Sequence, residues 1–335
     1  MKKEAKKVIV AFSGGVDSST SAFLLKKKGF DVSALFMNLF NSKKSEKKAK
    51  RLAKAMGIPF KVVDVRKEFK KKVIDYFINS YKKGLTPNPC VVCNEEIKFG
   101  LFLEEAQKMK ADFFATGHYA KVVKKRDGFH LLRASDSKKD QSYFLYRLSQ
   151  KQLSRVIFPL SLYTKEEVRK IAKRNRIPSF DFTESQEVCF VKDFKEFFKE
   201  KLGERKGKIV DKKGNVLGEH NGLWFYTIGQ RKGIGLSGGP YFVIGKDLKK
   251  NHLIVSKDEK DLLGKELKFN KANWILKKPK FPFKIKAKIR YGHIPASGIL
   301  TKSKLVFDKP QRAVTPGQSV VFYKGKEVIG GGIII

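Results

Sequence analysis

The amino-acid sequence predicts an α/β protein with a doubly wound parallel sheet, followed by one or two small all-β modules. Apolar, strand-like runs alternate with helical patterns through the first third of the chain. The first of these runs ends in a glycine pair that opens a helical pattern. After Gly203, short β-rich runs separated by Gly, Asn and Pro continue to the end. We place boundaries near residues 204 and 268, which gives domains at 1–203, 204–267 and 268–335.

The predicted elements of the first third justify the parallel sheet. Strands are expected at Val8–Phe12, Val32–Met37, Phe60–Val65 and Phe113–Thr116. Helices are expected between and after them, at Ser18–Lys28, Ser45–Met56, Lys67–Lys83 and Asn94–Met109. Strands that alternate with helices form a parallel sheet, and its ligands bind at the carboxyl ends of the strands. The glycine pair, Met37 and the run Thr116-Gly117-His118-Tyr119 lie at such ends.

A hairpin and a helical extension are expected next. Asp127-Gly128 predicts a hairpin over Lys121–Arg133. Periodic apolar residues predict helical structure over Gln141–Leu148, and Thr164 with Glu167 forms a capping box. A last helix is expected over Asp193–Leu202, where Gly203 ends it.

The stretch Ser13-Gly14-Gly15-Val16-Asp17-Ser18 joins the first strand to the first helix. Two glycines allow the backbone to turn sharply and approach a ligand, and the helix start offers unpaired N–H groups. This combination suits a phosphate. The loop is not a Walker A loop, because the pattern G-x-x-x-x-G-K-[ST] is absent. The alternative is a plain Gly-Gly turn capped by Asp or Ser.

Charge and composition narrow the class of partner. The chain has 73 Lys and Arg against 33 Asp and Glu, a net charge of +40, which indicates a polyanion such as a nucleic acid. Lysine-rich composition on solvated faces is the alternative. No apolar run approaches the ~18 residues that span a bilayer. The apolar run that follows the basic N-terminal residues is too short for a signal peptide. We therefore expect a cytoplasmic protein with no membrane contact.

Three cysteines are the other chemical signal. Cys90 and Cys93 have C-x-x-C spacing just before the helix expected from Asn94, and Cys189 stands alone. A helix N-terminus lowers a thiol pKa toward neutrality, which favours a nucleophile or metal ligand. The alternatives are inert buried thiols, a structural zinc, or sulfur chemistry through a persulfide relay or a three-cysteine iron–sulfur cluster.

Seven motifs extend these observations over almost the whole chain. The loop resembles the S-G-G-x-D-S signature of the PP-loop ATP pyrophosphatases. In order, the motifs are S-G-G-V-D-S, T-P-N-P-x-x-x-C-N-x-x-I-K-F (Thr86 to Phe99), A-T-G-H-Y (Ala115 to Tyr119), K-D-Q-S-Y-F-L-Y (Lys139 to Tyr146), E-S-x-x-x-C-F (Glu184 to Phe190), G-Q-R-K-G (Gly229 to Gly233) and A-V-T-P-G-Q (Ala313 to Gln318). Together they resemble the bacterial tRNA-specific 2-thiouridylase family.

That resemblance implies a fold and an activity. The fold is a PP-loop domain, a small central β domain and a C-terminal β-barrel. The activity uses ATP and Mg²⁺ to adenylate the C2 oxygen of the wobble uridine in tRNA, and sulfur then replaces that oxygen. We expect a sulfur-relay protein or a cysteine desulfurase to supply the sulfur, and we also expect the protein to be a monomer.

The resemblance also implies roles for single residues. Asp17 helps to place Mg²⁺, Cys189 carries the persulfide, and Cys93 is the nucleophile that closes a disulfide with it. The hydroxyls of Ser13, Ser18 and Ser19 hold pyrophosphate. The ATP site comprises Ala11, Phe12, Ser13, Gly14, Gly15, Val16, Asp17, Ser18, Met37 and Gly117. The target base meets Asn88, Pro89 and Cys90, and the other tRNA contacts are His118, Lys139, Asp140, Gln141, Arg290, Tyr291 and Gln318.

Three departures from the family pattern keep alternatives open. Many members carry Asp where this chain has Cys90, so a [4Fe-4S] cluster held by Cys90, Cys93 and Cys189 remains an alternative to the relay. The residues 186–188 differ from the usual T-G-x, and the loop after Met37 is short and lysine-rich. Two other functions also remain, a PP-loop ligase or amidotransferase for a small metabolite and a non-catalytic RNA-binding protein.

Overall fold

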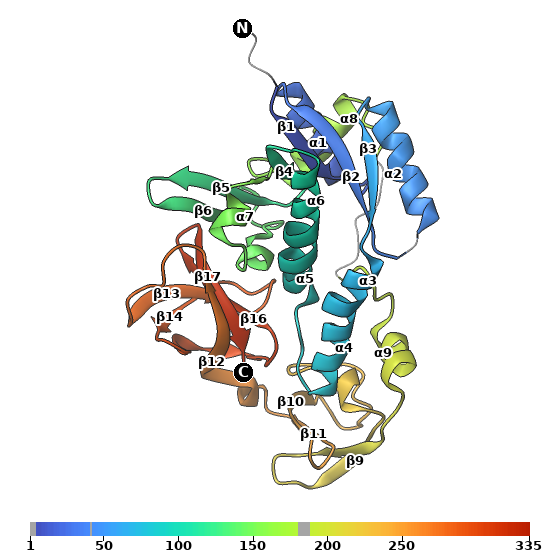
Figure 1. The fold of residues 1–335 in the computed structure, drawn as a ribbon. Helices are drawn as coiled ribbons and strands as arrows, with labels where there is room; N and C mark the ends of the chain where they lie inside the picture. Colours follow the sequence, from blue (N-terminus) through green and yellow to red (C-terminus); the bar gives the residue numbers. More distant parts are fainter. Residues whose placement is uncertain (1–4, 41, 180–187) are drawn as a thin grey trace.

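The computed structural model describes residues 5–40, 42–179 and 188–335, which are organised around three sheets (Figure 1). The first sheet has five strands in the order β3-β2-β1-β4-β7, and all its pairings are parallel. Its strands are β1 (Lys7–Ala11), β2 (Asp31–Asn38), β3 (Phe60–Asp64), β4 (Phe113–Ala115) and β7 (Val156–Ile157). The predicted parallel sheet is confirmed. The strand β7 was not predicted, because two residues are too few to show a strand pattern in the sequence.

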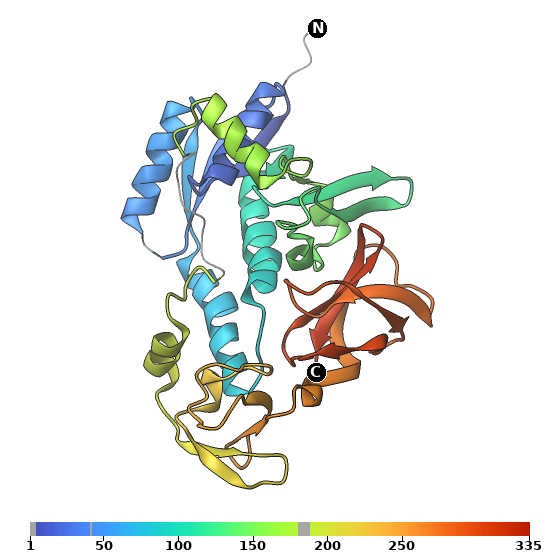
Figure 2. The same ribbon diagram turned by 180° about the vertical axis from the view of Figure 1, so that it is seen from behind.

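Helices cover both faces of this sheet (Figure 2). Val8 and Val10 pack with Leu52 of α2 on one side, whereas Ile9 packs with Phe102 of α6 on the other. Alternate residues of a strand point to opposite faces, so a strand covered on both sides is apolar throughout. The helices near the sheet are α1 (Val16–Lys27), α2 (Lys43–Ala55), α6 (Phe102–Lys108) and α8 (Lys165–Arg174).

Two long helical segments each contain a π-helical stretch. The first consists of α3 (Arg66–Phe69), η1 (Lys70–Ile74) and α4 (Asp75–Lys82), and the second of α5 (Pro89–Val92), η2 (Cys93–Leu101) and α6. The second was expected to begin near Asn94, which is wrong by five residues. Proline is tolerated in the first helical position because its missing N–H has no intrahelical partner there. The helix therefore begins at Pro89 and includes both cysteines of the C-x-x-C pair.

The helical extension agrees with the sequence only in part. The capping box is confirmed, since Thr164 and Glu167 exchange both hydrogen bonds at the start of α8. The short helices are α7 (Gln150–Leu153), η3 (Ser142–Leu145) and α9 (Phe194–Leu202). The expected helix over Gln141–Leu148 is wrong, because only the 3₁₀ turn η3 forms there. Buried Tyr143 donates a hydrogen bond to the carbonyl of Ser319, so packing against the C-terminal domain decides this segment.

The central sheet has the order β10-β11-β8-β9. Its elements are β8 (Gly207–Val210), β9 (Val216–His220), η4 (Leu223–Phe225), β10 (Phe242–Asp247) and β11 (His252–Ser256). Ile209, Val243 and Leu253 form its small core. Helices α4 and α9 both lie against η4. The central sheet is therefore tied to the first domain through α4.

The last sheet closes into a six-stranded antiparallel barrel, because β12 pairs with both β15 and β17. Its elements are η5 (Glu259–Leu262), β12 (Leu263–Trp274), β13 (Phe283–Lys288), β14 (Ala296–Leu300), β15 (Lys304–Arg312), β16 (Ser319–Lys324) and β17 (Glu327–Ile334). The expected C-terminal barrel is confirmed. The boundaries at 203/204 and 267/268 stay a prediction.

The predicted hairpin forms from β5 (Ala120–Lys125) and β6 (Gly128–Arg133), but it lies in an unexpected sheet. Leu131 and Leu132 of β6 pair with Val328 and Glu327 of β17. The hairpin thus adds two strands from the first domain to the sheet of the barrel. Among the described helices, none is long and apolar enough to cross a membrane.

Candidate active site

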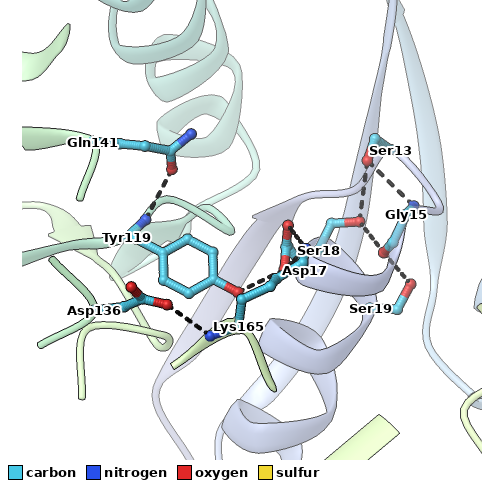
Figure 3. A network of polar contacts seen from close by, with 9 residues as sticks. All are labelled: Ser13, Gly15, Asp17, Ser18, Ser19, Tyr119, Asp136, Gln141 and Lys165. Carbon is cyan, nitrogen blue, oxygen red and sulfur yellow. Dashed lines mark hydrogen bonds and ion pairs between the residues drawn. The ribbon is translucent and has the colours of Figure 1, made fainter. Parts of the chain in front are cut away.

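The predicted phosphate loop lies between β1 and α1, at the carboxyl end of β1 (Figure 3). Gly15 is the N-cap of α1, and the hydroxyls of Ser18 and Ser19 donate to its carbonyl at 3.0 and 2.9 Å. The Ser13 hydroxyl lies 3.2 Å from that of Ser18. The three serines expected to hold pyrophosphate therefore fold back onto the loop. Ala11 ends β1, Phe12 is buried in the core and Met37 is next to last in β2.

Two glycines allow neighbouring chain segments to approach the loop. Gly14 has a φ of +77°, in the left-handed region that favours glycine, and a Cβ there would lie 3.2 Å from the Cα of Ala49. A Cβ on Gly117 would lie 3.0 Å from the backbone carbon of Asp17 and 3.1 Å from the nitrogen of Ser18. The segment after β4 thus presses directly on the start of α1.

Asp17 makes an ion pair that the sequence did not predict. The Nζ of Lys165, the first residue of α8, lies 2.7 and 2.8 Å from its two carboxylate oxygens. The Tyr119 hydroxyl donates to Asp17 at 2.9 Å, and the backbone N–H of Lys165 donates to Asp136 (Figure 3). The Lys165 side chain is 10% exposed and that of Asp17 is 33% exposed. A cation is therefore built into the loop site by a helix 148 residues later in the chain.

Cys93 lies in the core rather than at an open helix end. Its side chain is 8% exposed, and burial raises its thiol pKa to about 12, although the charge of Lys98 partly opposes this. The expectation of a pKa near neutrality is wrong for this conformation. A helix N-terminus favours the thiolate, but removal from water disfavours it more strongly here. The thiol needs a nearby cation, or a change in its surroundings, before it can act as a nucleophile.

The three cysteines come together despite their separation in sequence. Cys90 is half-buried and Cys189 is exposed, and the thiolate of each would raise the pKa of Cys93. Although part of the Cys189 side chain is exposed, the protein atoms packed around its thiol exclude enough water to raise its pKa, and Lys98 opposes this too. Such mutual influence requires short distances. Lys98 is therefore the cation that Cys93 and Cys189 share.

Aromatic packing holds the segment that carries Cys189. Residues 184–187 of its motif lie outside the described residues. The Phe190 ring contacts Phe69 and Phe77 edge-on, at centroid distances of 5.9 and 5.2 Å. Both partners lie in the helical segment that includes α3, η1 and α4. The chain next to Cys189 is thus anchored to this segment.

His118 connects the phosphate loop to the thiols. Its ring is buried, and burial together with Lys98 lowers its pKa well below the usual value. The Nζ of Lys98 lies 3.5 Å from Nε2, and Thr116 Oγ1 lies 2.8 Å from Nδ1. A neutral ring that accepts at Nε2 donates from Nδ1 to Thr116. His118 is therefore uncharged and offers no cation to an RNA phosphate.

The segment before Cys90 is held by the barrel. The side-chain amide of Gln318 donates to the carbonyl of Thr86 at 2.8 Å, and a Cβ on Gly317 would lie 2.9 Å from the Thr86 nitrogen. Asn88 is half-buried and Pro89 is buried. Gln318, expected as a tRNA contact, thus makes its hydrogen bond to the protein.

The remaining expected tRNA contacts divide into buried and exposed groups. Asp140 is 2% exposed, and its carboxylate accepts hydrogen bonds from Arg133, Ala134 and Ser142. Gln141 accepts from the backbone N–H of Tyr119 at 2.9 Å. These two side chains therefore bond to neighbouring parts of the protein. Lys139, which precedes them in the sequence, is half-buried.

The two expected contacts in the barrel lie at its surface. Arg290 is exposed, and its guanidinium donates to the carbonyl of Arg312 at 3.1 Å. The Tyr291 ring packs on Phe144 at 4.6 Å. Arg290 is the member of the expected set whose side chain is charged and exposed.

Comparison with known proteins identifies the family. Residues 6–193 match the description "tRNA methyl transferase HUP domain", residues 195–257 the "tRNA methyl transferase PRC-barrel domain", and residues 264–334 the "Aminomethyltransferase beta-barrel domain". The tRNA-specific 2-thiouridylase MnmA of Syntrophomonas wolfei is 46% identical over 338 residues, which cover 98% of this chain and 99% of that protein. The chain belongs to the tRNA-specific 2-thiouridylase family. The protein of the same name from Lactobacillus helveticus is 44% identical, over 98% of this chain and 95% of its own.

The predicted family and enzyme class are thus confirmed. A solved 4-thiouridine synthetase–RNA complex with bound ATP is 20% identical and covers 55% of this chain and 44% of its own, with a TM-score of 0.36. That likeness is too weak to carry an argument about this 2-thiouridylase family member.

The donor groups differ in how well they suit the metals that the resemblance implies. Mg²⁺ binds proteins through one or two carboxylates together with substrate phosphates, and Asp17 is one carboxylate at the phosphate loop. The loop therefore suits Mg²⁺ bound with ATP. Among the described residues, no group of three or more His, Cys, Asp or Glu side chains is arranged to hold a metal ion. The iron–sulfur alternative therefore stays a prediction.

Sequence reasoning missed three side chains of this 2-thiouridylase site. Lys165 and Tyr119 contact Asp17, and Lys98 lies next to His118 and favours the thiolates of Cys93 and Cys189. The position of Lys165 at the start of a helix could be predicted locally, because it follows the capping residue Thr164. Nothing in the local pattern relates that helix to Asp17. The contact depends on the packing of α8 against α1.

Proposed function

We propose that this chain catalyses the ATP-dependent 2-thiolation of the wobble uridine in tRNA. Membership of the 2-thiouridylase family supports the proposal. The structural observation that carries it is a line of contacts from the phosphate loop to the thiols. Gly117 presses on Asp17, the neighbouring His118 lies 3.5 Å from Lys98, and Lys98 favours the thiolates of Cys93 and Cys189.

The first half of the proposed reaction activates the base. A uracil carbonyl is a poor electrophile, so it needs a leaving group before sulfur can attack. The C2 oxygen attacks the α-phosphorus of ATP, the bond to the β-phosphate breaks, and pyrophosphate leaves as the base loses its N3 proton. The loop amides and Lys165 neutralise charge on the leaving pyrophosphate. Mg²⁺, when bound at Asp17, would screen the phosphate charges.

The second half transfers sulfur. The terminal sulfur of a Cys189 persulfide attacks C2, and AMP leaves with the electrons of the C–O bond. The Cys93 thiolate then attacks the Cys189 sulfur, so the persulfide S–S bond breaks and its outer sulfur stays on the base. A Cys93–Cys189 disulfide forms, and a thiol reductant returns two electrons to it. We expect a sulfur-relay protein or a cysteine desulfurase to load Cys189 again.

Three variants test the two halves separately. Asp17→Ala should lose ATP- and tRNA-dependent AMP formation while tRNA affinity stays nearly unchanged. Cys93→Ala and Cys189→Ala should lose thiolation, and Cys189→Ala should still form AMP when tRNA is present. Thiolated nucleoside is measured by mass spectrometry and AMP by chromatography. Normal thiolation by Asp17→Ala would contradict the ATP assignment, and normal thiolation by either cysteine variant would contradict the sulfur assignment.

The same assays separate the rival functions. A non-catalytic RNA-binding protein would form no AMP with any tRNA. A PP-loop ligase for a small metabolite would form AMP without tRNA once its metabolite is added.

A further inference from the structure

The central domain carries a basic, glycine-rich loop that the proposed chemistry does not use. It runs from Gly229 to Tyr241 between η4 and β10 and contains the G-Q-R-K-G motif. Gly233, Gly235 and Gly238 have φ values of +73°, +83° and +68°, a region that only glycine enters at little cost. These three glycines thus allow the loop a backbone conformation that other residues would adopt only with strain.

The loop is fixed by its own contacts. Ile234 at its centre is 5% exposed and packs in the small core of the central sheet. The Gln230 side chain accepts from the N–H of Thr227 and donates to the carbonyl of Lys232, both at 3.0 Å. A buried anchor and a side-chain bridge hold the loop in one conformation. Little ordering would be needed when a ligand binds.

The loop presents a run of unused donors. In the described part of the chain, the backbone N–H groups of residues 231–239 donate no hydrogen bond to another protein group. Successive N–H groups in such turns form concavities that bind anions. The residues just before the loop are paired, because the N–H of Gly229 donates to the carbonyl of Val243 and that of Gln230 to the carbonyl of Thr227.

The same loop lines an open hollow of about 560 Å³ whose charge is positive. Arg231, Lys232 and Tyr241 contribute to its lining, and no acidic residue of the described chain does. The side chains of Arg231 and Lys232 are exposed. Cationic side chains, free amides and an aromatic ring around one hollow match the oxygens of a nucleic-acid backbone.

The loop also continues a basic path from the barrel. A Cβ on Gly229 would lie 2.8 Å from the Cβ of Ala313, and the preceding Arg312 accepts a hydrogen bond from the exposed Arg290. The central sheet lies beside the barrel in both views (Figures 1 and 2). Arg290 on the barrel and Arg231 on the loop thus belong to neighbouring surfaces.

We propose that the loop Gly229–Tyr241 binds backbone phosphates of the tRNA away from the reacting base. This inference rests on the proposed function, because it takes tRNA as the polyanion. A site that modifies one base must leave the rest of the molecule to be held by contacts that carry no sequence information. The loop supplies such contacts, which add affinity for tRNA but take no part in the reaction.

Paired variants test the loop. Arg231→Gln/Lys232→Gln removes two charges from it, and Lys249→Gln/Lys250→Gln removes two from the turn at the other end of β10. The tRNA dissociation constant of each is measured over a series of salt concentrations. Each lost phosphate contact should reduce the slope of log K against log salt by about 0.7–0.9, or roughly 1.4–1.8 for the loop pair. The control pair should change the slope much less.

Turnover gives the second readout. The loop variant should raise KM for tRNA and keep kcat at saturating tRNA, because the loop contacts no reacting atom. A slope equal to that of the wild type, or an equal loss in the control pair, would overturn the inference while wild-type thiolation leaves the proposed function intact. A wild-type protein that neither binds nor thiolates tRNA would overturn the proposed function and the inference with it.

Discussion

The side-chain amide of Gln318 donates a hydrogen bond to the backbone carbonyl of Thr86, 232 residues earlier in the chain. The bond joins the barrel to the segment that leads into Asn88, Pro89 and Cys90. A second bond in the same place runs from the N–H of Thr86 to the carbonyl of Pro316. The barrel therefore fixes the segment that leads into the helix carrying Cys90 and Cys93.

Gln318→Leu should lower kcat more than it raises KM for tRNA. The change removes a hydrogen bond worth about 0.5–1.5 kcal/mol, so a roughly two- to tenfold loss of kcat is expected if the bond only positions the segment. Gln311→Leu is the matched control, because Gln311 bonds to His293 and Lys309 within the barrel. A rise in KM with kcat unchanged would instead make Gln318 a direct tRNA contact.

Lys165→Met should abolish ATP-dependent AMP formation and also destabilise the protein by about 1 kcal/mol, since it leaves Asp17 without its cation in a partly buried site. Adding Asp17→Asn should restore most of the stability but none of the activity. Chemical denaturation of the two single variants and the double variant measures this coupling. Equal and additive losses of stability would show that the pair contributes nothing in the folded protein.

Cys90 distinguishes the two sulfur mechanisms. In the persulfide relay, Cys90→Asp should retain thiolation, because only Cys93 and Cys189 exchange sulfur. Cys90→Ala should retain it as well. Iron and acid-labile sulfide are measured after anaerobic purification as the second readout. Iron in the wild type, lost together with thiolation in Cys90→Ala, would contradict the relay and favour a three-cysteine cluster.

His130 should make stability depend on pH. Burial favours its neutral ring, but hydrogen bonds to Asp127 and Glu327, at 2.8 and 2.7 Å, outweigh this and raise its pKa. Its contribution to stability is then complete below the unfolded pKa of about 6.5 and is lost as pH rises through the raised folded value.

The free energy of unfolding measured across this range checks the effect. His130→Gln should remove this component of the pH dependence, whereas His252→Gln in the central sheet should retain it. An unchanged profile for His130→Gln would show that another group titrates.

Local patterns were enough to find the parts of the site that local forces build. The phosphate loop needs a strand, two glycines and a helix start, and all of these are read from adjacent residues. The same holds for the capping box at Thr164. The fold class followed from the alternation of strands and helices.

Contacts made by packing could not be read in this way. Lys165 reaches Asp17 only because α8 packs on α1, and Cys93 has a raised pKa only because the core closes over it. The segment around Tyr143 has a helical sequence pattern but forms no α-helix, because Tyr143 is buried and hydrogen-bonded to Ser319 in the barrel. In each case the deciding partner is far away in the sequence.

The pairing of β6 with β17 bears on how the polypeptide can be divided. The family descriptions treat residues 6–193 and 264–334 as separate units. A fragment cut between them would expose the edge of β6 in one piece and that of β17 in the other, and open edges recruit strands from other molecules. Neither fragment on its own would then behave as it does in the whole chain. Co-expressed halves should reassemble through the pairing of β6 with β17, whereas each half expressed alone should aggregate.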